Sequence, residues 1–163
     1  MNLTFRKLEI DDLVFFNNVR NSFSEQFLHN SKQFTIQETE DWFKYNYPDY
    51  YIIELENEKI GYFRLSNHSI ENKNIYVGMD IEKEYQGRGF GYYVFNKFID
   101  YLFDVYDLNK ISLEVLKTNQ KAIRLYEKLG FIYEGEKREE VLKGGKYVNS
   151  LIFSILKRER RNK

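Results

Sequence analysis

The sequence lacks cysteine, contains a single proline and only two histidines, and carries no net charge. The absence of cysteine excludes disulfide bonds, cysteine-ligated zinc and a cysteine nucleophile. His29 and His68 are too few for a histidine metal centre, so we expect no bound metal. Because 25 basic residues balance 25 acidic residues, no overall field favours nucleic acid or an anionic membrane as a partner.

Long apolar runs are missing as well. No stretch of 18 apolar residues is present that could span a bilayer, and residues 1–7 lack the apolar centre of a secretory signal, so we expect a cytoplasmic protein. What the chain has in excess is aromatic side chains, 14 tyrosines and 14 phenylalanines, which indicate a core built largely of rings. Its 163 residues are enough for one domain, which we assign to residues 1–163.

Apolar periodicity and turn signals predict a mixed α/β fold with a mainly antiparallel sheet of six or seven strands and about four helices. In the first helix, Asp11 or Asp12 supplies the cap and residues 20–22 end it, with a loop or short helix following over residues 23–34. The strands are expected at residues 3–8, 50–55, 59–65, 75–81, 110–116, 131–141 and 146–156. The later helices are expected from a capping box at 35–38 to a point before Pro48, at 89–105, and at 119–129, where Gly130 ends the last one. A hairpin turn is expected at 144–145 and a basic tail at 157–163.

The densest signal is the glycine-rich stretch 84–92 (EYQGRGFGY), which joins the apolar strand 75–81 to the longest helix. A glycine-rich turn at a helix start leaves backbone N–H groups unpaired, and these groups together with the helix dipole bind phosphate. Arg88 adds a charged donor beside them. The stretch fits neither the dinucleotide fingerprint nor a P-loop, and a solvent-facing flexible turn is the alternative interpretation.

Residues 86–91 (QGRGFG) fit the pattern [Q/R]-x-x-G-x-[G/A], and residues 119–131 (NQKAIRLYEKLGF) fit N-x-x-A-x-x-x-Y-x-x-x-G-F. On these two motifs, which occur in the expected order, the chain resembles the GCN5-related N-acetyltransferase (GNAT) superfamily. The resemblance implies acetyl-coenzyme A as co-substrate and direct attack of a primary amine on its thioester. It also implies coenzyme contacts from Met79, Asp80, Ile81, Gln86, Gly87, Arg88, Gly89, Phe90, Gly91, Asn119, Tyr126 and Lys128.

Three residues are candidates for catalysis. Tyr126 occupies the position from which the resembled family protonates the coenzyme A sulfur, and a phenol with an ordinary pKa of about 10 stays protonated at neutral pH. Glu114, in the apolar run 111–116, matches the glutamate used as base by ribosomal-protein alanine N-acetyltransferases. Asp80 competes for the role of base, and a water chain is a third possibility. Tyr126 as a core aromatic and Glu114 as a structural carboxylate are the alternatives.

The acceptor is the least determined part. Arg20 and Asn21, followed by a T-x-x-x-x-x-x-W-F stretch at 35–43, resemble the opening of enzymes that acetylate nucleotide-linked amino sugars, with one residue more than that pattern. Such a sugar is therefore our first hypothesis, with Arg20 and Asn21 binding it. The segment 134–147 also resembles spermidine and ribosomal-protein acetyltransferases, so a polyamine or a protein N-terminus stays open. Two further alternatives also stay open, namely transfer of an acyl group other than acetyl and a non-catalytic acyl-CoA-binding module. We expect a monomer or a homodimer.

Overall fold

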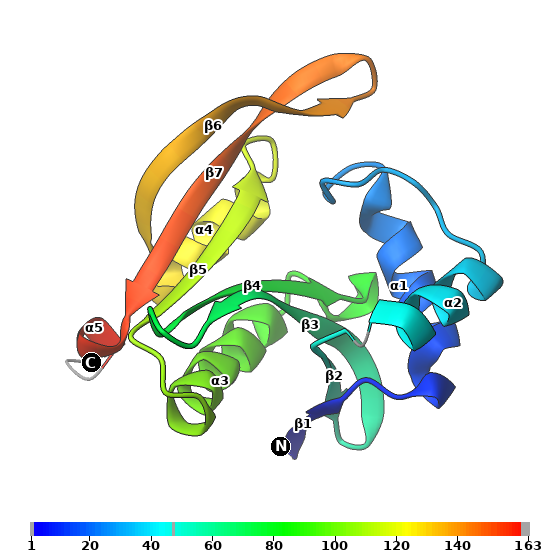
Figure 1. Cartoon of the computed structure of the whole chain (residues 1–163), viewed down its shortest axis with the longest axis horizontal. Coiled ribbons are helices and arrows are strands. Elements are labelled where there is room, and N and C mark those ends of the chain that lie inside the picture. Colours follow the sequence, from blue (N-terminus) through cyan, green and yellow to red (C-terminus); the bar gives the residue numbers. More distant parts are fainter. Residues whose placement is uncertain (1, 47, 161–163) are drawn as a thin grey trace.

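The computed structural model describes residues 2–46 and 48–160, and within them a seven-stranded sheet carries helices on both faces (Figure 1). The mixed α/β fold predicted from the sequence is thereby confirmed, while residues 161–163 of the predicted tail lie outside the described part. The strands are β1 (Leu3–Lys7), β2 (Tyr50–Leu55), β3 (Glu58–Ser69), β4 (Asn74–Ile81), β5 (Lys110–Leu116), β6 (Ile132–Lys143) and β7 (Lys146–Leu156). The helices are α1 (Leu13–Ser24), α2 (Ile36–Asn46), α3 (Phe90–Val105), α4 (Gln120–Leu129) and α5 (Lys157–Arg160), with 3-10 turns η1 (Ile10–Asp12) and η2 (Lys83–Tyr85).

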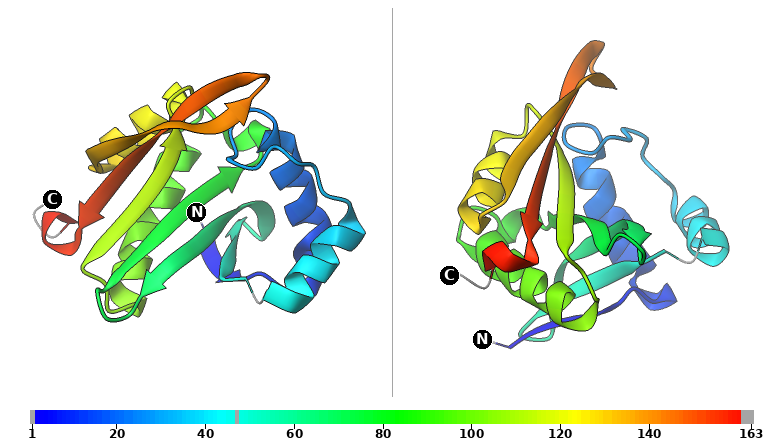
Figure 2. Two further views of the ribbon diagram at one scale, coloured as in Figure 1. Left: turned by 45° about the horizontal axis from the view of Figure 1, so that its top comes forward. Right: turned by 60° about the vertical axis from the view of Figure 1, so that its left-hand side comes forward.

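The strand order is β1-β2-β3-β4-β5-β7-β6, and β4 and β5 are the one parallel pair among these strands. β2, β3 and β4 form an antiparallel meander, in agreement with the mainly antiparallel sheet predicted from the sequence, and β4 is the middle strand of the sheet. The predicted hairpin is also present, since Gly144 and Gly145 adopt φ of +53° and +77° between β6 and β7. This hairpin reaches the loop after α1 (Figure 2), where Lys143 Nζ donates to Ser24 O at 2.8 Å and to Ser31 Oγ at 2.7 Å.

Alternation of side chains along the strands builds two apolar clusters, one on each face of the sheet. On one face Phe63 and its neighbours pack against α3 and α4. On the other face Ile52 and Tyr62 pack against α1, where the Phe16 ring lies 4.7 Å from the Tyr62 ring between centroids. Both faces of β2 and β3 are therefore covered. A polar side chain buried on either face requires a hydrogen-bond partner or a function.

The predicted end of the first helix at residues 20–22 is wrong, because α1 continues to Ser24. Phe23 is buried one turn beyond Val19 and extends the apolar stripe. The polar side chains that suggested a break are satisfied locally, since Ser22 Oγ donates to Val19 O at 2.7 Å and Ser24 Oγ donates to Asn21 O at 3.1 Å.

The predicted aspartate cap of α1 is also wrong, because the Asp12 side chain makes no capping hydrogen bond to that helix. Its buried carboxylate accepts two hydrogen bonds from Arg6, at 2.7 and 2.9 Å, and lies 2.7 Å from Lys59 Nζ. Burial alone would raise the pKa of Asp12, but the bonds from Arg6 and Lys59 outweigh it and hold that pKa well below its usual value. Asp12 thus ties the start of α1 to β1 and β3.

The other predicted helix ends are confirmed. Thr35 Oγ1 accepts the Glu38 N–H at 3.2 Å and Glu38 Oε2 accepts the Thr35 N–H at 2.8 Å, which is the expected capping box before α2. Gly130 ends α4 with φ of +94°. Within residues 2–46 and 48–160, no helix combines the length and apolarity that crossing a membrane requires.

Candidate functional site

The site begins where β4 and β5 separate. These strands pair only over residues 74–76 and 110–112, after which β5 continues beside β7 alone (Figure 1). Glu82 N–H donates to Ile60 O at 2.9 Å, and hydrogen bonding alternates along an antiparallel strand. The N–H and C=O groups of Met79 and Ile81 therefore point away from β3 and into the split.

The glycine-rich loop follows the same end of β4. Gly87 and Gly89 adopt φ of +73° and +85°, the left-handed conformation that favours glycine, while a Cβ at either position would meet no atom within 4 Å. Glycine is thus required here by the backbone and not by lack of space. Gly89 precedes α3 without any side-chain cap, and in the described part of the chain the N–H groups of residues 87–89 have no hydrogen-bond partner.

These exposed N–H groups at the start of a 16-residue helix fit a diphosphate. Gln86 serves the loop itself, because its Nε2 donates to Ile81 O at 2.9 Å and holds the loop against the end of β4. The Arg88 guanidinium lies 5.4 Å from the Phe90 ring centroid and leaves its N–H groups available. Gly91 lies inside α3, where a Cβ would be in ordinary contact with Leu125 and Met79.

Tyr126 comes from α4 and is buried, with its ring edge-on to Phe95 at 5.8 Å between centroids. Burial raises the pKa of Tyr126 to about 12, the charge of Asp80 adds to the increase and Arg64 opposes it. The charges that act on this phenol therefore come from Asp80 on β4 and Arg64 on β3. Elsewhere on α4, Asn119 Oδ1 accepts the Ala122 N–H at 3.2 Å and caps the helix, and Lys128 Nζ lies 4.8 Å from the Tyr92 ring centroid.

Asp80 is the direct partner of Tyr62 in the register of the adjacent strands β4 and β3. Its side chain is only 10% exposed, and its Oδ2 lies 3.6 Å from Arg64 Nη2, too far for a hydrogen bond. A Cβ on Gly78 would lie 2.7 Å from that same Arg64 nitrogen. The missing side chain at Gly78 therefore lets the guanidinium lie flat over β4 and reach Asp80.

Glu114 is differently placed from Asp80, because it already has ionic partners. Its Oε1 accepts a hydrogen bond from Lys137 Nζ at 2.6 Å, and its Oε2 lies 3.7 Å from His29 Nε2. His29 Nε2 is also 2.9 Å from Ser150 Oγ. Burial lowers the pKa of His29, although Glu114 opposes the shift, so the imidazole is neutral at neutral pH.

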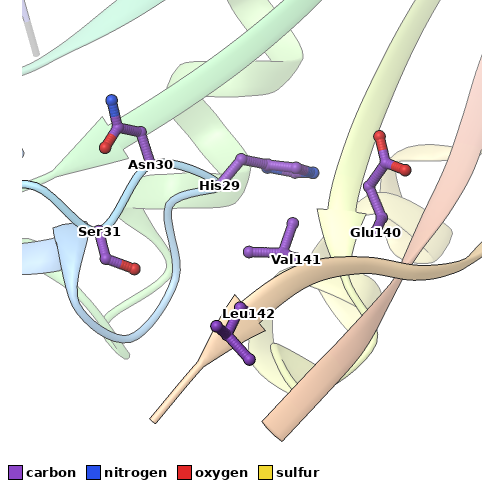
Figure 3. Close-up of a pocket in the computed structure, with 6 residues that line it drawn as sticks. All are labelled: His29, Asn30, Ser31, Glu140, Val141 and Leu142. Atoms are coloured by element: carbon purple, nitrogen blue, oxygen red, sulfur yellow. The ribbon is translucent and has the colours of Figure 1, made fainter. Parts of the chain in front are cut away.

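A pocket of about 520 Å³ opens beside His29 (Figure 3). In Figure 3 the His29 ring extends from the loop after α1 toward Glu140 of β6. The Val141 side chain, also from β6, points into the space between β6 and this loop. The pocket thus combines a carboxylate, an imidazole, small polar groups and aliphatic carbon. Its lining residues are His29, Asn30, Ser31, Glu140, Val141 and Leu142.

Arg20 and Asn21 hold one wall of this pocket. Arg20 Nη1 donates to Lys32 O at 2.8 Å and its guanidinium lies 4.3 Å over the Phe34 ring. Asn21 Nδ2 donates to Phe34 O at 2.8 Å, and Asn21 Oδ1 accepts the Phe34 N–H at 3.1 Å. In the structure these two side chains position the loop of residues 25–35.

Sequence reasoning missed several residues of the site. Tyr62 and Arg64 were part of an ordinary strand pattern, and Lys137 was part of a hairpin. One signal was present, since Gly78 interrupts an apolar strand and an interior strand glycine marks close approach of another group. No group of three or more histidine, aspartate and glutamate residues that could hold a metal ion occurs among the residues described.

Comparison with known proteins places this geometry in context. Residues 16–131 match the model of the acetyltransferase (GNAT) family. The spermidine N(1)-acetyltransferase of Vibrio cholerae is 33% identical over 153 residues, which cover 89% of this chain and 87% of that protein.

Solved structures agree with the sequence comparison. The crystal structure of spermidine N-acetyltransferase from Vibrio cholerae in complex with CoA and spermine is similar with a TM-score of 0.89 and 30% identity, over 98% of both chains. A dodecameric structure of the spermidine N-acetyltransferase from that organism, in an intermediate state, gives a TM-score of 0.84 and 29% identity, over 98% of this chain and 96% of the other.

Proposed function

This chain belongs to the GNAT family of acetyltransferases and is an acetyl-CoA-dependent N-acetyltransferase, and from this premise we propose that its acceptor is a polyamine. The observation that carries the proposal is the likeness, over nearly the whole of both chains, to an enzyme crystallised with CoA and spermine. It supports the polyamine alternative better than the nucleotide-linked amino sugar that the amino-terminal motif suggested.

The pocket beside His29 supports the same acceptor chemistry. A polyamine is an aliphatic chain that ends in ammonium groups, and it needs carboxylates separated by apolar surface. The Glu140 side chain is 43% exposed, lies 3.9 Å from Lys137 Nζ, beyond hydrogen-bond distance, and is next to Val141 and Leu142 in the pocket. We assign Glu140 to the ammonium group remote from the reaction, and we assign to Arg20 and Asn21 the positioning of the loop that forms the opposite wall.

In this proposal the coenzyme binds on the side of the split away from the pocket beside His29. The N–H groups of residues 87–89 and the start of α3 hold its diphosphate, with Arg88 as a charged donor. Backbone groups of Met79 and Ile81 hold the pantetheine arm and polarise the thioester carbonyl. Further contacts are assigned to the remaining candidates, namely Asp80, Gln86, Phe90, Gly91, Asn119 and Lys128.

Tyr126 and Asp80 then divide the proton transfers. The acceptor nitrogen forms a bond to the acetyl carbon as the carbon–sulfur bond breaks, and Asp80 Oδ2 takes the proton that the nitrogen loses. Tyr126 Oη gives a proton to the departing sulfur. We prefer Asp80 to Glu114 as the base because Glu114 is already bound to Lys137.

Release of thiol from acetyl-CoA across a panel of amines tests the acceptor. We expect kcat/KM for spermidine to exceed that for butylamine about tenfold, because a second ammonium group gains an ionic contact worth about 1.4 kcal/mol. Glu140→Gln should reduce this advantage and leave kcat/KM for butylamine unchanged, whereas Glu139→Gln, on the same strand outside the pocket, should change neither. Preference for a nucleotide-linked amino sugar or a peptide N-terminus would contradict the polyamine proposal.

A further inference from the structure

Two largely buried polar side chains, Tyr62 and Asp80, are neighbours on β3 and β4 and interact electrostatically with each other. Tyr62 is completely buried, Asp80 is its cross-strand neighbour, and both side chains lie on the α1 face of the sheet. In the described residues, Tyr62 Oη and Asp80 Oδ2 are the buried side-chain polar atoms that have no hydrogen-bond partner. Directly opposite residues on paired strands place such groups within reach of one small ligand.

A hydroxyl at Tyr62 is not needed for packing. The Tyr62 ring contacts the rings of Phe16 and Tyr50, at 4.7 and 5.9 Å between centroids, and a phenylalanine would make the same contacts. A buried hydroxyl without a partner destabilises the folded state. Burial raises the pKa of Tyr62 well above 10 and the charge of Asp80 adds to the shift, so the group is a neutral phenol.

Arg64 prepares the carboxylate without occupying it. Its guanidinium lies over Gly78 with Nη2 at 3.6 Å from Asp80 Oδ2, which is beyond hydrogen-bond distance. Asp80 Oδ2 therefore keeps its capacity to accept a hydrogen bond. Tyr62 Oη and Asp80 Oδ2 together offer two acceptor atoms on the α1 face of β3 and β4.

We infer that Tyr62 Oη and Asp80 Oδ2 together bind the attacking nitrogen of the acceptor and select primary amines. This inference rests on the proposed transfer to an amine. A neutral primary amine has two N–H groups, one for each acceptor atom, and its lone pair is then free to face the split. A neutral secondary amine has one N–H group and would leave one of the two buried atoms unpaired, which disfavours it strongly.

Tyr62→Phe tests this inference because it removes only the unpartnered oxygen. We expect KM for the primary-amine acceptor to rise about tenfold, which corresponds to about 1.4 kcal/mol, and Kd for coenzyme A to stay unchanged. The discrimination against N-methylbutylamine relative to butylamine should shrink by a similar factor. The melting temperature should stay the same or rise, since the hydroxyl has no partner in the free protein.

The matched control is Tyr51→Phe in the neighbouring strand. Tyr51 is also buried, but its hydroxyl is 2.7 Å from Tyr106 Oη on the other face, so this variant should lower the melting temperature and leave KM unchanged. An unchanged acceptor KM and unchanged amine selectivity in Tyr62→Phe would overturn the inference, whatever its stability. If the native enzyme prefers a primary amine other than a polyamine, the same variants are compared on that amine, so failure of the polyamine proposal is recognised separately.

Discussion

Tyr126→Phe is expected to lower kcat about a hundredfold while Kd for coenzyme A stays within about twofold. The variant removes the proton that the departing sulfur takes up, but it keeps the ring that packs edge-on against Phe95. An interaction that is made only as the carbon–sulfur bond breaks affects turnover and not ground-state binding. Steady-state kinetics and calorimetric titration with coenzyme A measure the two quantities.

The pH dependence sharpens this prediction. Because burial and the nearby charge of Asp80 raise the pKa of Tyr126 to about 12, the phenol keeps its proton below that pH. Ionisation of Tyr126 should therefore produce no loss of kcat in the native enzyme between pH 7 and about pH 10. Tyr133→Phe serves as the control, since Tyr133 is half exposed on β6 and should behave as the native enzyme. Equal losses of turnover and coenzyme affinity in Tyr126→Phe would contradict the acid role.

Asp80→Asn is expected to lower kcat/KM for the acceptor about a hundredfold at pH 7, because the amide cannot take up the proton of the attacking nitrogen. Glu114→Gln is expected to cost only a few-fold, since Glu114 is engaged with Lys137 and lies 3.7 Å from His29. Both substitutions keep the side-chain shape, so each reports on charge and proton transfer. Initial rates with spermidine at saturating acetyl-CoA measure the difference.

A pH profile shows at which step Asp80 takes up a proton. Primary amines have pKa values of about 10, so more of the acceptor arrives neutral as the pH rises. This gain applies equally to the native enzyme and to Asp80→Asn, because Asp80 acts on the nitrogen during attack, so the deficit of Asp80→Asn should stay similar from pH 7 to pH 10. A larger loss in Glu114→Gln than in Asp80→Asn would transfer the role to Glu114, and a deficit of Asp80→Asn that disappears toward pH 10 would show that Asp80 only deprotonates the ammonium group before attack.

Local signals in the sequence were sufficient for most of the elements. The glycines at 89, 130 and 144–145 mark helix and hairpin ends because left-handed backbone favours glycine whatever lies around it. The capping box at Thr35 was equally local. The end of α1 could not be predicted, because Arg20 and Asn21 are satisfied by Lys32 and Phe34 across a loop that the sequence does not place.

In the candidate site, too, residues within contiguous motifs could be predicted, whereas residues brought together by the sheet could not. The glycine-rich loop and Tyr126 belong to contiguous motifs, so both could be proposed as site residues from the sequence. The pairing of Tyr62 with Asp80 depends on the register of two strands, and the approach of Arg64 depends on the open space above Gly78. The ion pair that distinguishes Glu114 from Asp80 requires Lys137, which reaches Glu114 because β7 lies between β5 and β6. Such relations appear only when the sheet is assembled.

A crystal structure of the protein with coenzyme A and spermine would test the arrangement of donor and acceptor most directly. We expect the diphosphate on the N–H groups of residues 87–89, the sulfur beside Tyr126 Oη, and a terminal nitrogen of spermine between Tyr62 Oη and Asp80 Oδ2. A diphosphate bound away from that loop, or a spermine nitrogen reaching the sulfur from the side of Glu114 with Asp80 uncontacted, would contradict this account of the reaction.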